Sequence, residues 1–311
     1  MSELDEKVKK SIERLQSFCP EEGYYLAFSG GKDSVVCKAL LDMSGCKYDA
    51  TYRVTSVDPP ELVRFIKDQH PDVTREVPRY SDKSKNEKLR GKPINMWNLI
   101  AEKKKYPPTR RKRFCCEYLK ESGGDGRVTV TGVRWEESKT REDNQGIAVI
   151  HKLSGENLAE NIDFKINKAG SIVLVNDNDP SRRLLEQCYK RHKTTVNPII
   201  DWTESEVWAF IKGNGIPYCE LYDEGFSRLG CIGCPIAQQK QREKEFLRWP
   251  KYKTAYLSAF EKMLVARRDI RPFRIGGMDY PNATAADVFN WWMEYDVLPG
   301  QFNLFEDYEE E

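Results

Sequence analysis

Two kinds of hydrophobic pattern alternate along the first half of the chain. A short apolar, aromatic run at residues 24–28 is typical of a strand that is buried in a sheet, and residues 48–54 and 127–131 predict two further strands. Apolar residues at helical spacing occupy the neighbouring segments, such as residues 2–18 and 61–67. Strands that alternate with helices favour an α/β fold with a mostly parallel, doubly wound sheet.

The last third of the chain has the apolar spacing of helices. These predicted helices cover residues 203–212, 238–249, 253–268 and 285–295. Between residues 142 and 180, short apolar alternations broken by polar stretches predict an inserted hairpin or a pair of strands. We therefore predict an α/β domain over residues 1–200 and a C-terminal helical subdomain, which also carries cysteines, over residues 201–311.

The sequence SGGKDS follows the first predicted strand directly and opens a helix. Two glycines allow the backbone to approach a ligand closely, and the start of a helix presents unpaired amides and a positive dipole. The Lys32 ammonium adds positive charge, so the predicted guest is a phosphate. Asp33 would repel a bare phosphate and is expected to act through Mg²⁺. The predicted phosphate contacts are Ser29, Gly30, Gly31, Lys32, Asp33 and Ser34.

SGGKDS in this position resembles the PP-loop of ATP pyrophosphatases and phosphoadenosine phosphosulfate (PAPS) reductases, in the adenine nucleotide alpha hydrolase-like superfamily. The resemblance implies that an adenine nucleotide binds here. It also implies either cleavage of ATP into AMP and pyrophosphate or reduction of an adenylylated sulfate. A Gly-rich turn without a ligand is the structural alternative.

Further polar residues follow two other predicted strands. Asp58 ends the second strand, and Gly132 and Arg134 come just after the strand at residues 127–131. The carboxyl ends of parallel strands are where such sheets bind ligands, and arginine can hold a phosphate through two parallel hydrogen bonds. We predict nucleotide contacts for these three residues and for Arg141, with helix capping as the alternative for Asp58.

The distribution of charged residues favours a local basic patch over a chain that is basic throughout. The chain has 50 basic and 49 acidic residues, a formal charge of +1. Seven basic residues nevertheless gather at positions 103–113 around two prolines, where they are expected either to be solvated or to steer nucleotide or nucleic-acid phosphates. No apolar run reaches transmembrane length, and the first residues do not resemble a signal peptide, so we expect no membrane partner and a cytoplasmic location.

Nine cysteines without an export signal favour free thiols or metal ligands over disulfides. Cys231 and Cys234 form a CxxC flanked by glycine, Cys115 and Cys116 are adjacent, and Cys219 is a fifth candidate. Thiolates in such a set suit an iron–sulfur cluster or zinc. We rank a [4Fe–4S] cluster first, zinc second and an isolated redox pair third.

Five blocks extend the resemblance to PAPS reductases across residues 24–235: VTSVDPPELVRFI, PPTRRKRFCCEYLKE, TGVRWEESKTR, NPIIDWTESEVWAFI and LYDEGFSRLGCIGCP. Similarity to the cluster-bearing adenylylsulfate reductases implies the ligands Cys115, Cys116, Cys231 and Cys234. Similarity to the ATP pyrophosphatase subunit of DNA phosphorothioation systems implies Cys219 in place of Cys116. The fourth ligand stays open between these two residues.

The family's reductases carry a catalytic cysteine in a C-terminal ECGxH block, whereas the last cysteine here is Cys234. We therefore predict an ATP pyrophosphatase that adenylylates a substrate for sulfur transfer, with Lys32, Asp33 and Arg134 as catalytic residues. Nucleic acid is the predicted acceptor and a cysteine desulfurase the predicted sulfur donor. The alternatives are a thioredoxin-dependent reductase of PAPS or adenylylsulfate, and a non-catalytic subunit that binds nucleotide and cluster.

Overall fold

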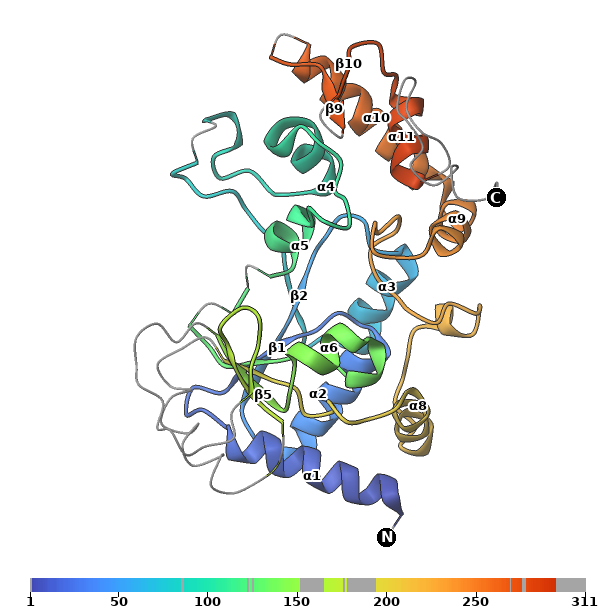
Figure 1. Ribbon diagram of the computed structural model, residues 1–311. Helices are drawn as coiled ribbons and strands as arrows, with labels where there is room; N and C mark the ends of the chain where they lie inside the picture. The colour runs from blue at the N-terminus through green and yellow to red at the C-terminus, as the bar shows by residue number, and fades with distance from the viewer. Residues whose placement is uncertain are drawn as a thin grey trace, which may run out of the picture. The chain divides into compact units, whose positions relative to one another are not determined.

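The computed structural model in Figure 1 describes residues 2–84, 87–121, 123–124, 126–151, 165–175, 177, 194–268, 270–275 and 278–294. The chain divides into two compact units, each assembled from separate segments. The first unit comprises Met1–Arg53, Pro60–Glu76 and Gly123–Leu229, and the second comprises Val54–Pro59, Val77–Ser122 and Gly230–Glu311. The predicted domain boundary at residue 200 stays a prediction.

The described part of the first unit contains an eight-stranded sheet in the order β3-β2-β1-β4-β8-β5-β7-β6. The first five strands in this order are parallel, whereas β5, β7 and β6 pair antiparallel at one side. The strands are β1 (Tyr24–Ala27), β2 (Tyr48–Arg53), β3 (Thr74–Glu76), β4 (Thr129–Val130), β5 (Ala148–Ile150), β6 (Lys165–Ile166), β7 (Ile172–Leu174) and β8 (Thr194–Val196). This mostly parallel sheet with flanking helices confirms the predicted α/β class (Figure 1).

The helices of the first unit lie on segments where the sequence gives them local start signals. They are α1 (Glu3–Ser17), α2 (Lys32–Ser44), α3 (Pro60–Gln69), α6 (Lys139–Asn144) and α8 (Glu204–Gly213), with single 3₁₀ turns η3 (Trp135–Glu137) and η5 (Glu220–Tyr222). Helix α8 starts with a capping box, in which the Thr203 side chain accepts a hydrogen bond from the Glu206 amide. Pro60 begins α3, where its missing N–H costs nothing.

Helix α1 is fixed to the rest of the first unit by polar contacts as well as by apolar ones. The buried Arg14 guanidinium donates to both carboxylate oxygens of Asp177 at 3.0 and 2.8 Å and of Asp201 at 2.7 and 2.8 Å. It also donates to the Pro198 carbonyl at 2.9 Å. Because two carboxylates and a carbonyl surround it, the buried charge is both paired and hydrogen-bonded.

The second unit is mainly helical around an aromatic core. Its elements are η1 (Glu87–Leu89), α4 (Met96–Asn98), the π-helical turn η2 (Leu99–Lys104), α5 (Phe114–Leu119), α9 (Gln239–Arg248), α10 (Pro250–Arg267), α11 (Ala285–Met293) and the hairpin strands β9 (Phe273–Ile275) and β10 (Met278–Tyr280). Tyr256 and Phe260 of α10 pack against Trp292 of α11 with ring centroids 4.7 and 5.6 Å apart. All three rings are buried and contribute apolar area to the core of this unit.

One expectation about a single side chain was wrong: the histidines lie outside the recognisable sequence blocks and were therefore predicted at the surface. His70, predicted at the surface, is buried between Phe28 and Phe65, with ring centroids 4.8 and 5.1 Å away. Burial lowers the pKa of His70, so the imidazole is neutral at pH 7. Glu61, for which the sequence left a ligand contact and a solvated position open, is also buried. The third histidine (residue 192), Cys188 and the acidic tail lie outside the described residues.

Candidate functional site

The loop Ser29–Gly31 joins β1 to the N-terminus of α2. Gly30 has φ +73°, and a Cβ on it would lie 2.7 Å from Ile66 of α3, so only glycine fits there. The hydroxyl of Ser29 donates to the hydroxyl of Ser34 at 3.2 Å, and Ser34 Oγ donates to the Gly31 carbonyl at 2.8 Å. The serines therefore shape the loop itself. Among the described residues, no hydrogen-bond partner faces the amides of Asp33 and Ser34, which leaves them available to an anion.

Lys32 is held in place by groups of the first unit on several sides. Its Nζ donates to the Ser227 carbonyl at 3.2 Å and lies 3.7 Å from Asp33 Oδ2 and 3.6 Å from Glu204 Oε1. The ammonium also lies 5.7 Å from the centroid of the Tyr222 ring. With only 6% of its side chain exposed, Lys32 presents a positioned charge beside the loop rather than a mobile surface charge.

Arg134 approaches the same place from the segment after β4. Its Nε donates to Asp33 Oδ1 at 2.8 Å, and its Nη1 donates to Glu136 Oε2 at 2.7 Å. Its Nη2 lies 3.8 Å from Glu204 Oε2. Burial works to lower the pKa of Arg134, but Asp33 and Glu136 outweigh it and raise the pKa. The structure therefore brings together Lys32, Asp33 and Arg134, the three residues predicted from the sequence to be catalytic.

The other predicted nucleotide contacts fall in different places. Gly132 lies so close to α2 that a Cβ would be 2.8 Å from the Asp33 Cβ, whereas Arg141 pairs with Glu137. Asp58 belongs to the second unit, where the Tyr252 hydroxyl donates to its carbonyl at 3.0 Å. Since Asp33 accepts from Arg134, a Mg²⁺ ion at Asp33 would share that carboxylate; the Mg²⁺ role stays a prediction.

Three residues of this site were missed at the level of sequence. Glu204, Tyr222 and Ser227 all contact Lys32, from α8, from η5 and from the loop that follows it. Glu204 stands in the capping segment TESE and looks there like an ordinary acidic first-turn residue. No local signal marks these three side chains, because their role arises only from the packing of distant segments.

A group of four thiols lies in the second unit. Cys115 and Cys116 are adjacent in α5, and their side chains interact. Cys231 and Cys234 stand in a turn where the Cys234 amide donates to the Cys231 carbonyl at 3.2 Å. Gly233 has φ +71° within this turn, and its amide donates to Glu245 Oε2 at 2.7 Å. The turn is therefore fixed by α9, and both pairs of thiols are placed by structured backbone.

Charge couples these thiols to one another and to a lysine. The hydrogen bond from Cys115 lowers the pKa of Cys116 to about 6, whereas burial raises the pKa of Cys231 to about 12. Cys231 is the main cause of the raised pKa of Lys120, with further contributions from Asp58, Cys116 and Cys234. A lysine near several sulfurs would balance the negative charge of a thiolate group.

Cysteine thiols are suitable ligands for an iron–sulfur cluster, but the positions of these four side chains do not form a metal-binding arrangement. In the part of the chain that the structure describes, no three Cys, His, Asp or Glu side chains are arranged to hold a metal ion. We therefore assign no chemical step to a cluster or to zinc.

Cys219 stands apart from the four thiols in its surroundings. It is buried in the first unit, where burial raises its pKa and the nearby acidic groups are Glu61, Glu220 and Glu224. Cys116, by contrast, interacts with Cys115 and Lys120. Cys116 is thus the candidate with described contacts to another of these thiols, and the choice of the fourth ligand stays a prediction.

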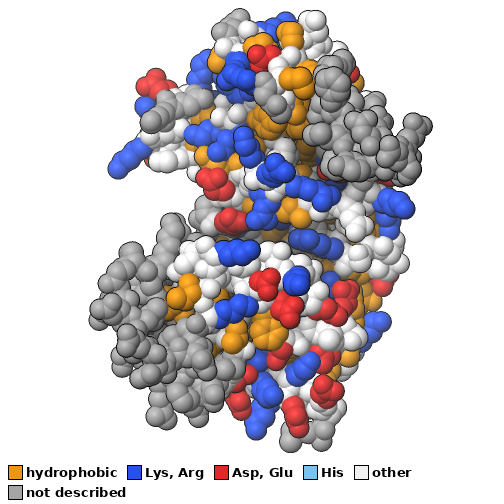
Figure 2. All heavy atoms as spheres, viewed as in Figure 1, with side chains coloured by type: hydrophobic (Ala, Val, Ile, Leu, Met, Phe, Trp, Pro, Cys, Tyr) orange, Lys and Arg blue, Asp and Glu red, His pale blue; other side chains and the backbone are white. Residues whose placement is uncertain are grey.

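The basic segment at residues 103–113 borders a groove of about 640 Å³ in the second unit. Its lining residues are Lys104, Tyr106, Lys112, Arg113, Phe114, Glu117, Glu121 and Arg267. Lys104 lies over the ring of Tyr118 at 4.7 Å, and Lys112 lies over the ring of Tyr106 at 5.7 Å. Elsewhere, basic and acidic side chains are interspersed over much of the visible face (Figure 2), in keeping with the formal charge of +1.

A parallel sheet whose first strand leads through SGGKDS into a helix, with Lys32 and Arg134 beside that helix start, defines a nucleotide-binding α/β protein of the PP-loop type. Residues 23–237 match the phosphoadenosine phosphosulfate reductase domain, which is more than half of the chain. The chain therefore belongs to the PAPS reductase family. Its likeness to the ATP pyrophosphatase subunit of phosphorothioation systems stays a prediction.

Individual relatives are more distant. An uncharacterized protein of Methanocaldococcus jannaschii is 29% identical over 276 residues, which cover 84% of this chain and 52% of that protein. The chain thus spans about half the length of this curated relative. An adenosine 5'-phosphosulfate reductase of Neisseria meningitidis is 53% identical over 38 residues, 12% of this chain and 16% of that protein. A solved PAPS reductase of Candida auris aligns with 74% of this chain and 96% of its own at 16% identity, with a TM-score of 0.38.

The helices that the structure describes include none with the length and apolar character needed to cross a membrane.

Proposed function

We propose that this protein is an ATP pyrophosphatase that adenylylates a substrate and so prepares it for sulfur transfer. The observation that carries the proposal is that Lys32 and Arg134 both lie beside Asp33 at the N-terminus of α2. The backbone amides of Asp33 and Ser34 are available there to bind an anion. Membership of the PAPS reductase family supports binding of an adenine nucleotide and an enzymatic role. Both cations are nearly buried, so their charge acts with little screening by water.

The proposed chemistry is displacement at the α-phosphorus of ATP. An acceptor oxygen forms a bond to that phosphorus while the bond to the bridging oxygen breaks, and pyrophosphate leaves with the electron pair. Lys32, Arg134 and the amides of Asp33 and Ser34 neutralise the charge that accumulates on the phosphate oxygens. Bound Mg²⁺ would supply further neutralising charge there, with Asp33 as its predicted ligand.

We propose nucleic acid as the acceptor. Lysines and arginines beside aromatic rings are suited to a single strand, and the basic segment at residues 103–113 combines both. Once the acceptor is adenylylated, a sulfur nucleophile at the oxidation level of sulfide displaces AMP, which leaves with the bonding electrons. A cysteine desulfurase, acting with a thiol reductant, is the proposed source of that sulfur.

The assay that tests the function supplies purified protein with ATP and Mg²⁺, with and without single-stranded DNA or RNA. We expect pyrophosphate release that is faster when the acceptor is present, with the AMP moiety retained on the acceptor until sulfide is added and then released in an amount equal to the pyrophosphate. Formation of ADP and phosphate, or no turnover under either condition, would contradict the proposal.

A reductase is the second candidate function, and it is favoured by the match to the phosphoadenosine phosphosulfate reductase domain together with the two adjacent thiols of α5, because a thiolate is the reactive form of cysteine. In that case the protein would convert PAPS or adenylylsulfate to sulfite at the expense of a thioredoxin. The two functions give different products from different substrates. Sulfite formation without pyrophosphate release would replace the first proposal by the second.

Metal content provides a separate prediction. The described side chains are not arranged to hold a metal ion, but the chemistry of four neighbouring thiols suits a cluster. We therefore propose that protein purified without oxygen contains iron and acid-labile sulfide held by Cys115, Cys116, Cys231 and Cys234. Cys116→Ser is therefore expected to lose most of the iron, and the matched variant Cys219→Ser to retain it. Zinc in place of iron would support the alternative metal, and loss of iron in Cys219→Ser alone would reverse the ligand assignment.

A further inference from the structure

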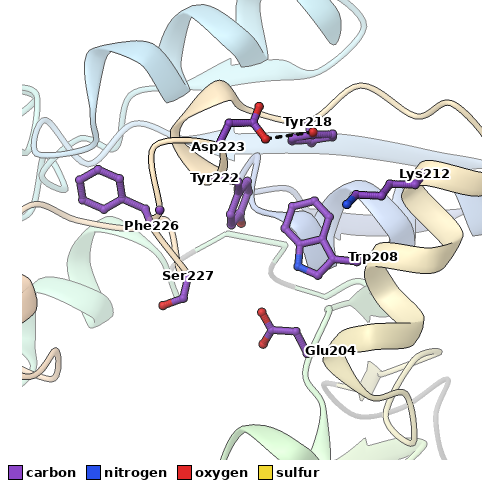
Figure 3. A pocket seen from close by; sticks show the side chains of 9 residues that line it. Glu204, Trp208, Lys212, Tyr218, Tyr222, Asp223, Phe226 and Ser227 are labelled. Atoms are coloured by element: carbon purple, nitrogen blue, oxygen red, sulfur yellow. Dashed lines mark hydrogen bonds between the residues drawn. The ribbon is translucent and has the colours of Figure 1, made fainter.

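A cavity of about 340 Å³ lies in the first unit between α8 and the segment around η5 (Figure 3). Three aromatic side chains border it: Trp208 from α8, and Tyr218 and Tyr222 from the segment that follows. Neither the phosphate loop nor the four thiols line it. Tyr222 also contacts Lys32, whereas the mechanism proposed above gives Trp208 and Tyr218 no task.

The three rings form an angular frame. The Trp208 ring lies 5.2 Å from Tyr218 and 5.0 Å from Tyr222, with interplanar angles of 82° and 84°. All three side chains are half-buried, so part of each ring packs against the protein and part is exposed to solvent. Edge-to-face contacts of this kind hold rings in place without covering all their faces, which suits them to receive another flat ring.

Polar groups stand at the border of the same cavity. Among the described residues, the indole N–H of Trp208 has no hydrogen-bond partner, and Figure 3 shows this nitrogen on the side of the ring toward Glu204. Burial raises the pKa of Tyr222, so its hydroxyl keeps a proton to donate. The cavity thus offers donors, and an acceptor in Glu204, beside apolar faces.

The cavity is also continuous with the groups that hold the phosphate loop. The Tyr222 hydroxyl accepts a hydrogen bond from the Lys32 amide at 2.9 Å. Glu204 and Ser227, which line the cavity, contact the Lys32 ammonium. A ligand seated among the rings would therefore lie next to the cation proposed to act on the α-phosphate.

We infer that this cavity binds a nucleobase, stacked on or against Trp208 with its edge directed at the polar groups. A base is flat, presents donors and acceptors along its edge and is small enough for a space of this volume. The inference deepens the proposed function, on which it rests, because it supplies a recognition element beside the reacting phosphate. The base belongs either to the acceptor strand, turned out from its neighbours, or to ATP itself.

The test compares Trp208→Ala with Trp208→Phe, which keeps a ring at the same position. Binding is measured for ATP, for a short single-stranded DNA and for an abasic strand of equal length. Loss of one stacking partner is expected to weaken binding of the base-bearing probe by roughly 5- to 100-fold, with the phenylalanine variant near wild type. The abasic strand should bind all three proteins equally.

The two sources of the base give different results. If the acceptor supplies it, Trp208→Ala loses the preference for the normal strand over the abasic one and binds ATP as wild type does. If ATP supplies it, affinity for ATP falls and the strand preference is unchanged. Unchanged binding of every probe in Trp208→Ala would overturn the inference.

A second variant guards against a folding defect. Tyr218→Ala removes another ring of the frame from a loop rather than from a helix, and thermal unfolding of both variants is compared with wild type. Pyrophosphate release by the wild-type protein is measured separately. Absence of release would remove the proposed function, while the comparison of normal and abasic strands would still report on the cavity.

Discussion

Replacement of Lys32 by alanine is expected to lower pyrophosphate release from ATP by about 10²- to 10³-fold, the loss typical of removing one group that stabilises transition-state charge. Lys32 is nearly buried and is positioned by Ser227, Glu204 and Tyr222. A water molecule in its place would therefore stabilise the negative charge on the phosphate less than the ammonium does. The measurement is the rate of pyrophosphate formation at saturating ATP.

Lys38→Ala provides the matched control, because Lys38 belongs to the same helix but pairs with Asp72 at 2.9 Å, away from the loop. That variant should retain the wild-type rate. Should Lys32→Ala keep a rate within a few-fold of wild type while it remains folded, the loop would not be the place where ATP reacts.

Replacement of Arg14 by alanine is expected to give the largest loss of stability, about 3–5 kcal/mol at neutral pH. The substitution removes a guanidinium that is 3% exposed and leaves Asp177 and Asp201, both largely covered, without their cation. The free energy of unfolding from urea titrations measures the effect. Arg75→Ala, at an exposed arginine of β3, should change it by no more than about 0.5 kcal/mol.

The effect of Arg14 should depend on pH. Burial works to raise the pKa of Asp201, but the hydrogen bonds and charge of Arg14 outweigh it and lower the pKa below its ordinary value. A carboxylate with a lowered pKa contributes stability that is present above the ordinary value near 4 and is lost as the pH falls through the folded-state pKa. The difference in the free energy of unfolding between wild type and Arg14→Ala should therefore become smaller as the pH falls below about 4. A difference that stays constant would mean that the carboxylates are not responsible.

The parts of the fold that were predictable are those with local signals. Residues 24–26 of β1 are buried, and β1 has parallel neighbours on both sides, a central position that the apolar character of the run already indicates. The start of α8 follows from Thr203 and Glu206 because a capping box acts within a single turn. The phosphate loop follows from two glycines, a lysine and a helix start in one short stretch.

The parts that could not be predicted depend on contacts between distant segments. Nothing in TESE indicates that Glu204 faces Lys32, and nothing near Asp58 indicates that it belongs with Lys120 rather than with the loop. His70 follows a charged helix end, yet Phe28 and Phe65 enclose it. Packing between segments, rather than propensity within them, decides such positions.

The discontinuous path of the chain has a consequence for dissecting the protein. Segment Val54–Pro59 leaves the first unit after β2 and Pro60–Glu76 returns to it, so each unit needs pieces from both halves of the polypeptide. A gene cut at codon 200 would remove α8 and η5 from the first unit and leave the two cysteine pairs on different fragments. Neither fragment would then carry a complete nucleotide site or a complete set of thiols. Deletion variants should therefore keep all residues from Ser2 to Glu294.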